Sequence, residues 1–338
     1  MRVLLIKTSS LGDVIHTLPA LTDAQRAIPG IQFDWVVEEG FAEIPSWHPA
    51  VAEVIPVAIR RWRKQLWQTY KSGEWRALKQ RIKQQSYDLT IDAQGLLKSA
   101  WLTRFNLAPV AGFDKQSARE SVASYFYDAK YQVATDLHAV ERTRRLFALA
   151  LGYSITGKAA EYGLQRRHKA LAQPYVMFLH GTTWPSKHWP EQYWRHLAEQ
   201  LNSQGIAVHL AWGNAAEQQR AERIAHELEQ VTVLPQLNLA GVADEIANAT
   251  ACVAVDTGLG HLAAALDVPT ISLYGPTLPG RVGAYGKGQI HLCAEHPLAG
   301  KGDRQLPCFD DLTPDKVLQH LQPLLQPTTG SAAPTASE

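Results

Sequence analysis

The sequence has 338 residues, of which 46% are hydrophobic and 19% are charged, and its formal net charge is +1. This composition is ordinary for a soluble globular protein of about two domains, and a charge near zero disfavours a dedicated nucleic-acid binder. No apolar run reaches the ~18 residues that a membrane-spanning helix needs. Residues 3–6 are too short for a signal-peptide core, and the three cysteines show no CxxC spacing. These features predict a cytoplasmic protein without a zinc site.

Strand-like and helix-like patterns alternate along the first half of the sequence. Strands are expected at residues 2–7, 33–38, 54–57, 88–93 and 109–113. A helical pattern follows the first strand up to Ala27, and Pro19 within it predicts either a kink or a later helix start. Alternation of this kind indicates a parallel sheet that is covered on both faces.

The alternation is interrupted at residues 154–174, which are polar and aperiodic, and we place an interdomain linker at 156–174. Beyond it, strands are expected at 175–180, 206–212, 251–255 and 270–275, and helices at 190–205, 216–230, 259–267 and 312–325. Residues 326–338 are low in complexity and predict a disordered tail. The sequence therefore predicts an α/β protein with two lobes, residues 1–155 and 175–325, each with its own parallel sheet. Basic residues exceed acidic ones in residues 1–160 and the reverse holds beyond them, which suggests different ligands for the two lobes.

The loop after the first expected strand lies in the stretch KTSSLGDVIH, residues 7–16, and carries Asp13 at the start of a helical pattern. A carboxylate there suits either of two roles. It stabilises the helix N-terminus as a cap, or it serves as a catalytic base at the carboxyl end of a parallel strand. Asp92 ends another expected strand and is compatible with a place in the cleft or with a purely structural role.

Two stretches of the second half are suited to binding phosphate. HGTTWPSKHWP, residues 180–190, offers two hydroxyls and a lysine, and hydroxyls, backbone amides and an ammonium group are what phosphate oxygens require. DTGLGHL, residues 256–262, follows a buried strand and places Gly258 and Gly260 where a ligand can approach the backbone at a helix N-terminus. A plain loop is the alternative for residues 180–190.

Glu217, in the stretch WGNAAEQ, lies in the first turn of an expected helix. A carboxylate there accepts hydrogen bonds from ribose hydroxyls in many nucleotide-binding folds, but it also simply suits the helix dipole. The sequence contains no GxGxxG, Walker A or HExxH pattern. We therefore expect lysine, hydroxyls and amides, rather than a bound metal, to neutralise a phosphate-bearing ligand.

Residues 57–83 contain nine Lys/Arg and one acid, Glu74, with Trp62, Trp67 and Trp75 interleaved. Such a run is either a solvated helical face or a surface for an anionic partner. Its one-sided charge and its aromatic residues favour the second interpretation. Candidate partners are a phosphorylated acceptor, anionic lipid headgroups or RNA.

Taken together, these stretches resemble the lipopolysaccharide heptosyltransferases of glycosyltransferase family 9. The resemblance spans about residues 1–325 and rests on KTSSLGDVIHTLPAL, VVEEGFAEIPSWHP, RRWRK, DAQGLLKSA, HAVERTR, the pattern TTxxxKHWP, WGxxxE, and DTGLGHL followed by YGPT. It is strongest toward the members that add the first heptose of the inner core. One departure is Gly260, where the family more commonly has serine.

The resemblance implies the GT-B fold, in which two Rossmann-like parallel-sheet lobes face a central cleft. It implies an inverting transfer of L-glycero-D-manno-heptose from ADP-heptose to the Kdo of Kdo2-lipid A, without a metal or a cofactor. It also implies a cytoplasmic enzyme that binds peripherally to the anionic inner leaflet of the inner membrane, with no nucleic-acid partner.

Carried over residue by residue, the resemblance assigns catalysis to Asp13, as the base. The donor-binding positions are Thr182, Thr183, Lys187, Glu217, Asp256, Thr257, Gly258 and His261. The acceptor-binding positions are Arg60, Arg61, Arg63, Lys64 and Arg119.

Three alternatives stay open at this point. A family member that uses an already heptosylated acceptor would share most of these residues. A GT-B nucleotide-sugar epimerase would act on the donor alone and would need no basic acceptor lobe. A non-enzymatic lipid- or RNA-binding protein would keep the basic stretch, residues 57–83, but would not need Asp13.

Overall fold

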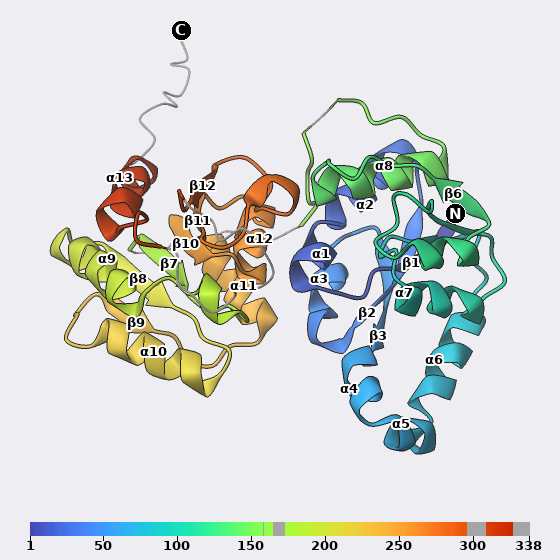
Figure 1. Cartoon of the computed structure of the whole chain (residues 1–338), viewed down its shortest axis with the longest axis horizontal. Coiled ribbons are helices and arrows are strands. Elements are labelled where there is room, and N and C mark those ends of the chain that lie inside the picture. The colour runs from blue at the N-terminus through green and yellow to red at the C-terminus, as the bar shows by residue number, and fades with distance from the viewer. Residues whose placement is uncertain (158, 165–172, 296–308, 327–338) are drawn as a thin grey trace, which may run out of the picture.

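The computed structural model describes residues 1–157, 159–164, 173–295 and 309–326, and it contains two α/β lobes that follow one another along the chain (Figure 1). Each lobe is built on a six-stranded parallel sheet. The prediction of an α/β protein with two Rossmann-like parallel-sheet lobes is thus confirmed. Residues 158 and 165–172 of the predicted linker, and 327–338 of the predicted tail, lie outside the described residues.

The sheet of the first lobe has the strand order β3-β2-β1-β4-β5-β6. Its strands are β1 (Arg2–Ile6), β2 (Gln32–Glu38), β3 (Val51–Val57), β4 (Leu89–Asp92), β5 (Val110–Phe113) and β6 (Ala129–Tyr131). From β1, the strands β2 and β3 extend the sheet to one edge, and β4, β5 and β6 extend it from β1 to the other edge. The strand order therefore reverses between β1 and β4, and such a switch point opens a crevice at the carboxyl ends of the strands.

Helices cover both faces of this sheet. They are α1 (Leu11–Ile15), α2 (Leu18–Ala27), α3 (Glu43–Ser46), α4 (Ile59–Lys64), α5 (Leu66–Ser72), α6 (Glu74–Lys83), α7 (Leu97–Leu102) and α8 (Ala139–Leu151). Because side chains alternate along a strand, Val3 and Leu5 of β1 join the core beside α1, α2 and α8, whereas Leu4 and Ile6 join the core beside α4, α6 and α7.

The second lobe repeats this plan with the strand order β12-β11-β10-β7-β8-β9 and a switch point between β7 and β10. Its strands are β7 (Tyr175–Leu179), β8 (Ala207–Leu210), β9 (Val231–Val233), β10 (Ala251–Val255), β11 (Thr270–Tyr274) and β12 (Gln289–Cys293). Its helices are α9 (Glu191–Ser203), α10 (Ala215–Ala225), α11 (Leu239–Asn248), α12 (Gly258–Ala265) and α13 (Pro314–Leu325). No helix in the described part of the chain is both long and apolar enough to cross a membrane.

Several expected element bounds differ from the structure. The helical pattern after β1 is two helices, and Pro19 lies in the first turn of α2, where its missing N–H is not needed. The helix expected at 216–230 ends at Ala225, and Glu227 has a left-handed backbone (φ 60°) that a helix cannot continue through. The short strands β6, β9 and β12 are absent from the sequence prediction, because three to five residues carry too little periodicity. The ten-residue helix α11 is also absent from it.

The two lobes approach closely where α1 of the first lobe packs against α12 of the second. A Cβ atom on Gly12 would lie 2.6 Å from Cδ2 of His261, and one on Gly258 would lie 2.6 Å from Cδ2 of Leu11. Each helix therefore uses a glycine to admit a side chain of the other. This contact brings the loop after β1 next to the loop after β10.

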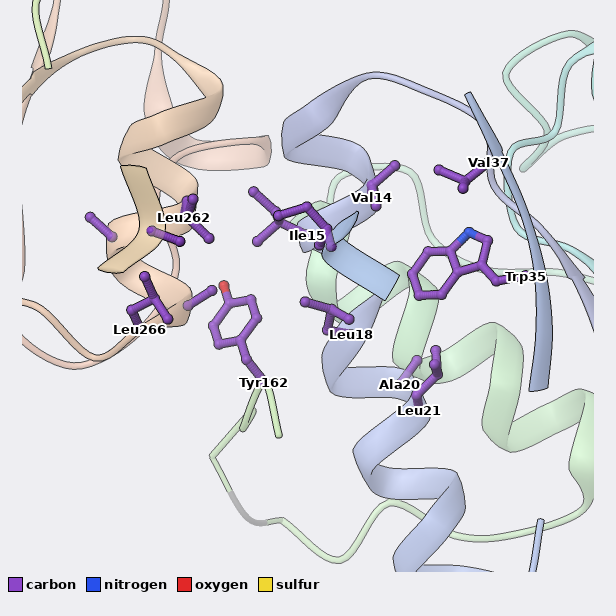
Figure 2. Packing of buried hydrophobic residues seen from close by; sticks show 14 of the residues in the cluster. Val14, Ile15, Leu18, Ala20, Leu21, Trp35, Val37, Tyr162, Leu262 and Leu266 are labelled. Atoms are coloured by element: carbon purple, nitrogen blue, oxygen red, sulfur yellow. The ribbon is translucent and has the colours of Figure 1, made fainter. Parts of the chain in front are cut away.

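A continuous apolar core surrounds this contact. Figure 2 shows Ile15 and Leu18 of the first lobe beside Leu262 and Leu266 of the second, with Tyr162 close by. All five side chains belong to one buried or partly buried cluster, and the hydroxyl of Tyr162 donates a hydrogen bond to the carbonyl of Tyr285 (2.8 Å). The loops after β1 and β10 thus lie beside a packed interface between the lobes.

Candidate active site

The predicted base and the predicted donor residues lie at the carboxyl ends of the two sheets. Asp13 lies on α1 after β1, Lys187 between β7 and α9, Glu217 on α10 after β8, and Asp256 directly after β10. The packing of α1 against α12 brings the first and last of these loops together. The sequence pattern had placed each residue after a strand, and the fold places the strands' switch points opposite each other.

Asp13 combines a structural contact with an accessible carboxylate. Its Oδ2 accepts hydrogen bonds from the backbone N–H of Ser10 (2.8 Å) and from the hydroxyl of Ser10 (3.0 Å), which ties down the start of α1. Its Oδ1 lies 3.8 Å from Nζ of Lys7, and its side chain is 23% exposed. Asp13 therefore caps its helix while one carboxylate oxygen stays available for proton transfer.

The charges around Asp13 keep it ionised. Burial on its own raises the pKa of Asp13, but the ammonium of Lys7, the hydrogen bonds from Ser10 and the guanidinium of Arg119 together outweigh burial and lower it. Nη1 of Arg119 lies 4.0 Å from Oδ2 of Asp13. Near neutral pH, Asp13 is consequently a carboxylate ready to accept a proton.

Lys7 belongs to this site, although it had not been predicted as a site residue. It follows β1 directly, its side chain is only 9% exposed, and its Nζ donates a hydrogen bond to the carbonyl of Ala93 (3.0 Å). Burial lowers the pKa of Lys7, and the nearby charges of Asp13 and Asp92 oppose that effect. The signal in the sequence was a lysine at the end of a buried strand, six residues before the expected base.

His261 connects the two halves of the site. Its ring is buried on α12 against Gly12 of α1, and its Nδ1 has no hydrogen-bond partner among the described residues. Burial lowers the pKa of His261 to about 4, although the charges of Asp256 and Asp13 both act in the opposite direction. The ring is therefore neutral at pH 7 and lies within electrostatic reach of both carboxylates.

The donor side of the site is organised around Asp256. Its Oδ2 lies 2.6 Å from Nζ of Lys187 and accepts a hydrogen bond from the hydroxyl of Thr277 (2.7 Å). Thr182 donates a hydrogen bond from its hydroxyl to the backbone carbonyl of Asp256 (3.1 Å). Lys187 also lies over the ring of Trp184, 4.4 Å from its centroid. Thr277 belongs to the YGPT stretch and had not been named as a site residue.

Glu217 lies beside the loop after β7, which carries the predicted phosphate-binding residues. Its Oε2 accepts a hydrogen bond from the backbone N–H of Gly213 (2.8 Å). A Cβ atom on Gly181 would lie 2.8 Å from the carboxyl carbon of Glu217, so Gly181 leaves room for this side chain. The carboxylate therefore spans the loops after β7 and β8.

The remaining predicted donor residues lie at the start of α12 or beside it. Thr257 is the residue before α12, and Gly258 is its first residue. Thr183 is exposed in the loop after β7. Gly260 is buried, and a Cβ atom there would lie 3.2 Å from Cβ of Ala254 on β10, so a side chain at this position would face the sheet.

The five predicted acceptor residues are divided between different surroundings. Arg119 is next to Asp13, whereas Arg60, Arg61, Arg63 and Lys64 lie on α4. Arg61 forms ion pairs with Glu39 (3.2 Å) and Glu74 (2.9 Å). The guanidinium of Arg60 lies over the ring of Phe41, 5.4 Å from its centroid.

Arg61 is engaged in holding α4 to its neighbours, so α4 offers Arg60, Arg63 and Lys64 more freely to a ligand.

Within the described residues, no group of three or more His, Cys, Asp or Glu side chains could hold a metal ion.

Two doubly wound lobes with a site between their switch points define the GT-B architecture. Residues 75–307 match the glycosyltransferase family 9 (heptosyltransferase) family. The chain therefore belongs to glycosyltransferase family 9, the heptosyltransferases.

Named relatives and solved structures agree with this assignment. The chain is 62% identical to the lipopolysaccharide heptosyltransferase 1 of Pseudomonas aeruginosa, with 96% of this chain and 98% of that protein covered. The structure of the E. coli heptosyltransferase WaaC with ADP has a TM-score of 0.90 and 50% identity, covering 96% of this chain and 100% of that chain. The same enzyme with ADP-2-deoxy-2-fluoro heptose gives a TM-score of 0.88 and 49% identity, covering 96% and 99%.

Proposed function

We propose that the protein transfers L-glycero-D-manno-heptose from ADP-heptose to the Kdo of Kdo2-lipid A, with inversion and without a metal. This reaction adds the first heptose of the lipopolysaccharide inner core. The observation that carries the proposal is that Asp13 of one lobe and Asp256 of the other, which is paired with Lys187, both act electrostatically on the ring of His261 at the contact between the lobes. The WaaC structures with ADP and with a fluorinated ADP-heptose support the donor, and the name of the 62% identical relative, lipopolysaccharide heptosyltransferase 1, supports a lipopolysaccharide acceptor.

In this proposal, Asp13 is the general base. Its carboxylate takes the proton from the acceptor hydroxyl as that oxygen attacks the anomeric carbon of the heptose. Inversion requires one displacement, so a single base suffices and no covalent intermediate forms. Lys7 and Ser10 are positioning residues, because they hold the carboxylate ionised and in place. Helix capping and catalysis are compatible roles for Asp13.

The diphosphate of ADP leaves toward the second lobe. Lys187, the hydroxyls of Thr182 and Thr183, and the backbone amides at residues 257–260 stabilise the charge that develops on it. Lys187 is paired with Asp256, so the diphosphate competes with that carboxylate for the ammonium group. Asp256 and His261 orient the heptose side of the donor, and Glu217 binds the ribose hydroxyls.

The acceptor binds to the first lobe. Arg119 contacts the acceptor sugar close to Asp13. On α4, Arg60, Arg63 and Lys64 bind the carboxylates and phosphates of the acceptor. Arg61 holds α4 in place through its ion pairs. The same cations attract the anionic inner leaflet, so the enzyme is held at the cytoplasmic face of the inner membrane electrostatically. Nucleic acid has no part in this proposal.

The pH dependence of kcat/KM follows from the lowered pKa of Asp13. A base acts only when ionised, and a lowered pKa means that Asp13 becomes half-protonated only below the ordinary aspartate value of about 3.9. We therefore expect no acid limb assignable to Asp13 between about pH 8 and pH 5. A pH series of kcat/KM measures this. An acid limb near pH 6 that disappears in the Asp13→Asn variant would contradict it.

The proposed function is tested by measuring ADP release from ADP-heptose with three mixtures. One contains Kdo2-lipid A, one contains the acceptor already carrying a heptose, and one contains no acceptor. We expect release only with Kdo2-lipid A, and NMR of the product should show an inverted anomeric centre. Release only with the heptosylated acceptor would assign the enzyme to the following transfer. Conversion of the donor without any acceptor would indicate epimerase or hydrolase chemistry instead.

A further inference from the structure

A large pocket lies in the first lobe between the helices α4, α5 and α6 and the helix α7. Its volume is about 980 Å³, which is at the upper end of the range of about 300–1,000 Å³ for small-molecule sites. Figure 1 shows α4, α5 and α6 at the end of the lobe that is farthest from α8. The donor residues of the second lobe do not line this pocket.

The walls of the pocket are mostly apolar and aromatic. Trp75 stacks on Trp101, with the ring centroids 4.4 Å apart, and Trp62 meets Trp75 edge-on at 5.4 Å. Leu97 and Trp101 are 46% and 43% exposed, and both line the pocket. Large apolar side chains that form one exposed hollow indicate a binding surface for an apolar group.

Two polar groups of these walls are already engaged within the protein. The indole N–H of Trp62 donates to Oε2 of Glu74 (2.8 Å). Glu120, which is the acidic residue of the lining, accepts a hydrogen bond from the backbone N–H of Leu97 (2.7 Å). A sugar ring would need hydrogen-bond partners for its hydroxyls. Apart from its cations the lining is mostly apolar and aromatic, so the geometry favours a hydrocarbon occupant.

Three cations, Arg63, Arg76 and Lys98, also line the pocket. Burial lowers the pKa of Lys98, and Arg60, Arg63 and Arg119 lower it further against the opposing charge of Glu38. Several cations thus lie close together around Lys98, and a bound anionic group would reduce the repulsion between them.

The pocket is also connected to the proposed base. Nζ of Lys98 donates a hydrogen bond to the hydroxyl of Ser9 (3.2 Å), and the next residue, Ser10, holds the carboxylate of Asp13. A ligand whose anionic part lies at Lys98 can therefore extend one end toward Asp13 and the other end into the pocket.

We propose that this pocket binds an acyl chain of the lipid acceptor, while Arg63, Arg76 and Lys98 bind the anionic groups at the base of that chain. The inference rests on the proposed function and adds to it a hydrocarbon-binding site on the enzyme. The anionic groups and the chain belong to the same molecule, so one ligand satisfies both the cations and the aromatic walls. Each methylene buried in the pocket strengthens binding roughly fourfold, so a few of them have a measurable effect on the KM of the acceptor.

The test compares Kdo2-lipid A with the same acceptor stripped of its acyl chains, at one fixed detergent concentration. For the wild type we expect the KM of the chain-free acceptor to be about tenfold higher or more, with a similar kcat. Trp101→Ala should raise the KM of the acylated acceptor about five- to tenfold and leave that of the chain-free acceptor unchanged. Leu97→Ser provides a second variant at a half-exposed position, and thermal melting checks that both variants are folded.

Trp67→Ala is the matched control, because Trp67 is 79% exposed on the neighbouring helix α5 and does not line the pocket. It should leave both KM values unchanged. Equal KM values for the two acceptors in the wild type would overturn the acyl-chain site while leaving the proposed function intact. An equal effect of Trp67→Ala and Trp101→Ala would also overturn it, in favour of general adsorption to the lipid surface. If the enzyme released no ADP with either acceptor, the proposed function would be overturned, and this inference with it.

Discussion

Replacing Asp13 with asparagine is expected to lower kcat by about 10²–10⁴-fold at saturating substrates. Asparagine has nearly the shape of aspartate, and its side-chain oxygen can still accept the hydrogen bond from Ser10 that ties down α1. It cannot take up a proton from the acceptor hydroxyl. The variant therefore separates the two roles that the sequence left open for this residue, and steady-state measurement of ADP release reports the result.

Asp13→Ala is the comparison that completes this experiment. Alanine removes both the base and the hydrogen bonds from Ser10, and in both variants Lys7 keeps only Asp92 as an anionic neighbour. We expect the two variants to be equally slow, with the alanine variant less stable by about 1 kcal/mol because it has lost the cap. If Asp13→Asn kept wild-type kcat and only Asp13→Ala were impaired, Asp13 would be a cap alone and another residue would have to be the base.

The sequence could predict the residues whose position is set locally. Asp13 and Asp256 each follow a short buried strand, and the carboxyl end of a parallel strand is where ligands bind. Asp92 ends β4 in the same manner, yet its carboxylate accepts hydrogen bonds from Tyr127 (2.7 Å) and Ser99 (2.9 Å) within the core. Burial raises the pKa of Asp92 despite those bonds. Its structural role depends on Tyr127, which no local pattern connects to it.

Contacts between distant segments explain what sequence reasoning missed. Lys7 binds the carbonyl of Ala93, 86 residues further on, so its burial and its place beside Asp13 could not be seen from the loop alone. Gly258 had been predicted to expose the backbone to a ligand, and the structure adds that it makes room for Leu11 of the other lobe. Arg61 looked equivalent to its neighbours in RRWRK, but Glu39 and Glu74 single it out as a structural residue.

Replacing Lys187 with glutamine is expected to lower kcat by about 10²–10³-fold, since the departing diphosphate would lose the ammonium group that stabilises its charge. Lys187 and Asp256 are 15% and 11% exposed, so water screens this charge only weakly. Steady-state kinetics with varied ADP-heptose measure the effect. Lys287→Gln is the matched control, because it removes the same charge from an exposed position of the same lobe and should leave kcat unchanged.

A loss in Lys187→Gln has a second possible origin, because the substitution also leaves the carboxylate of Asp256 unpaired near the diphosphate. The variant Asp256→Asn and the double variant distinguish the two origins in a double-mutant cycle. Asparagine can still accept the hydrogen bond from Thr277, so the loop should keep its geometry. If Lys187 stabilises the leaving group, its removal costs as much in the Asp256→Asn background as in the wild type. If Lys187 serves only to neutralise Asp256, the cost disappears in that background, and the stabilising charge must come from the amides at the start of α12.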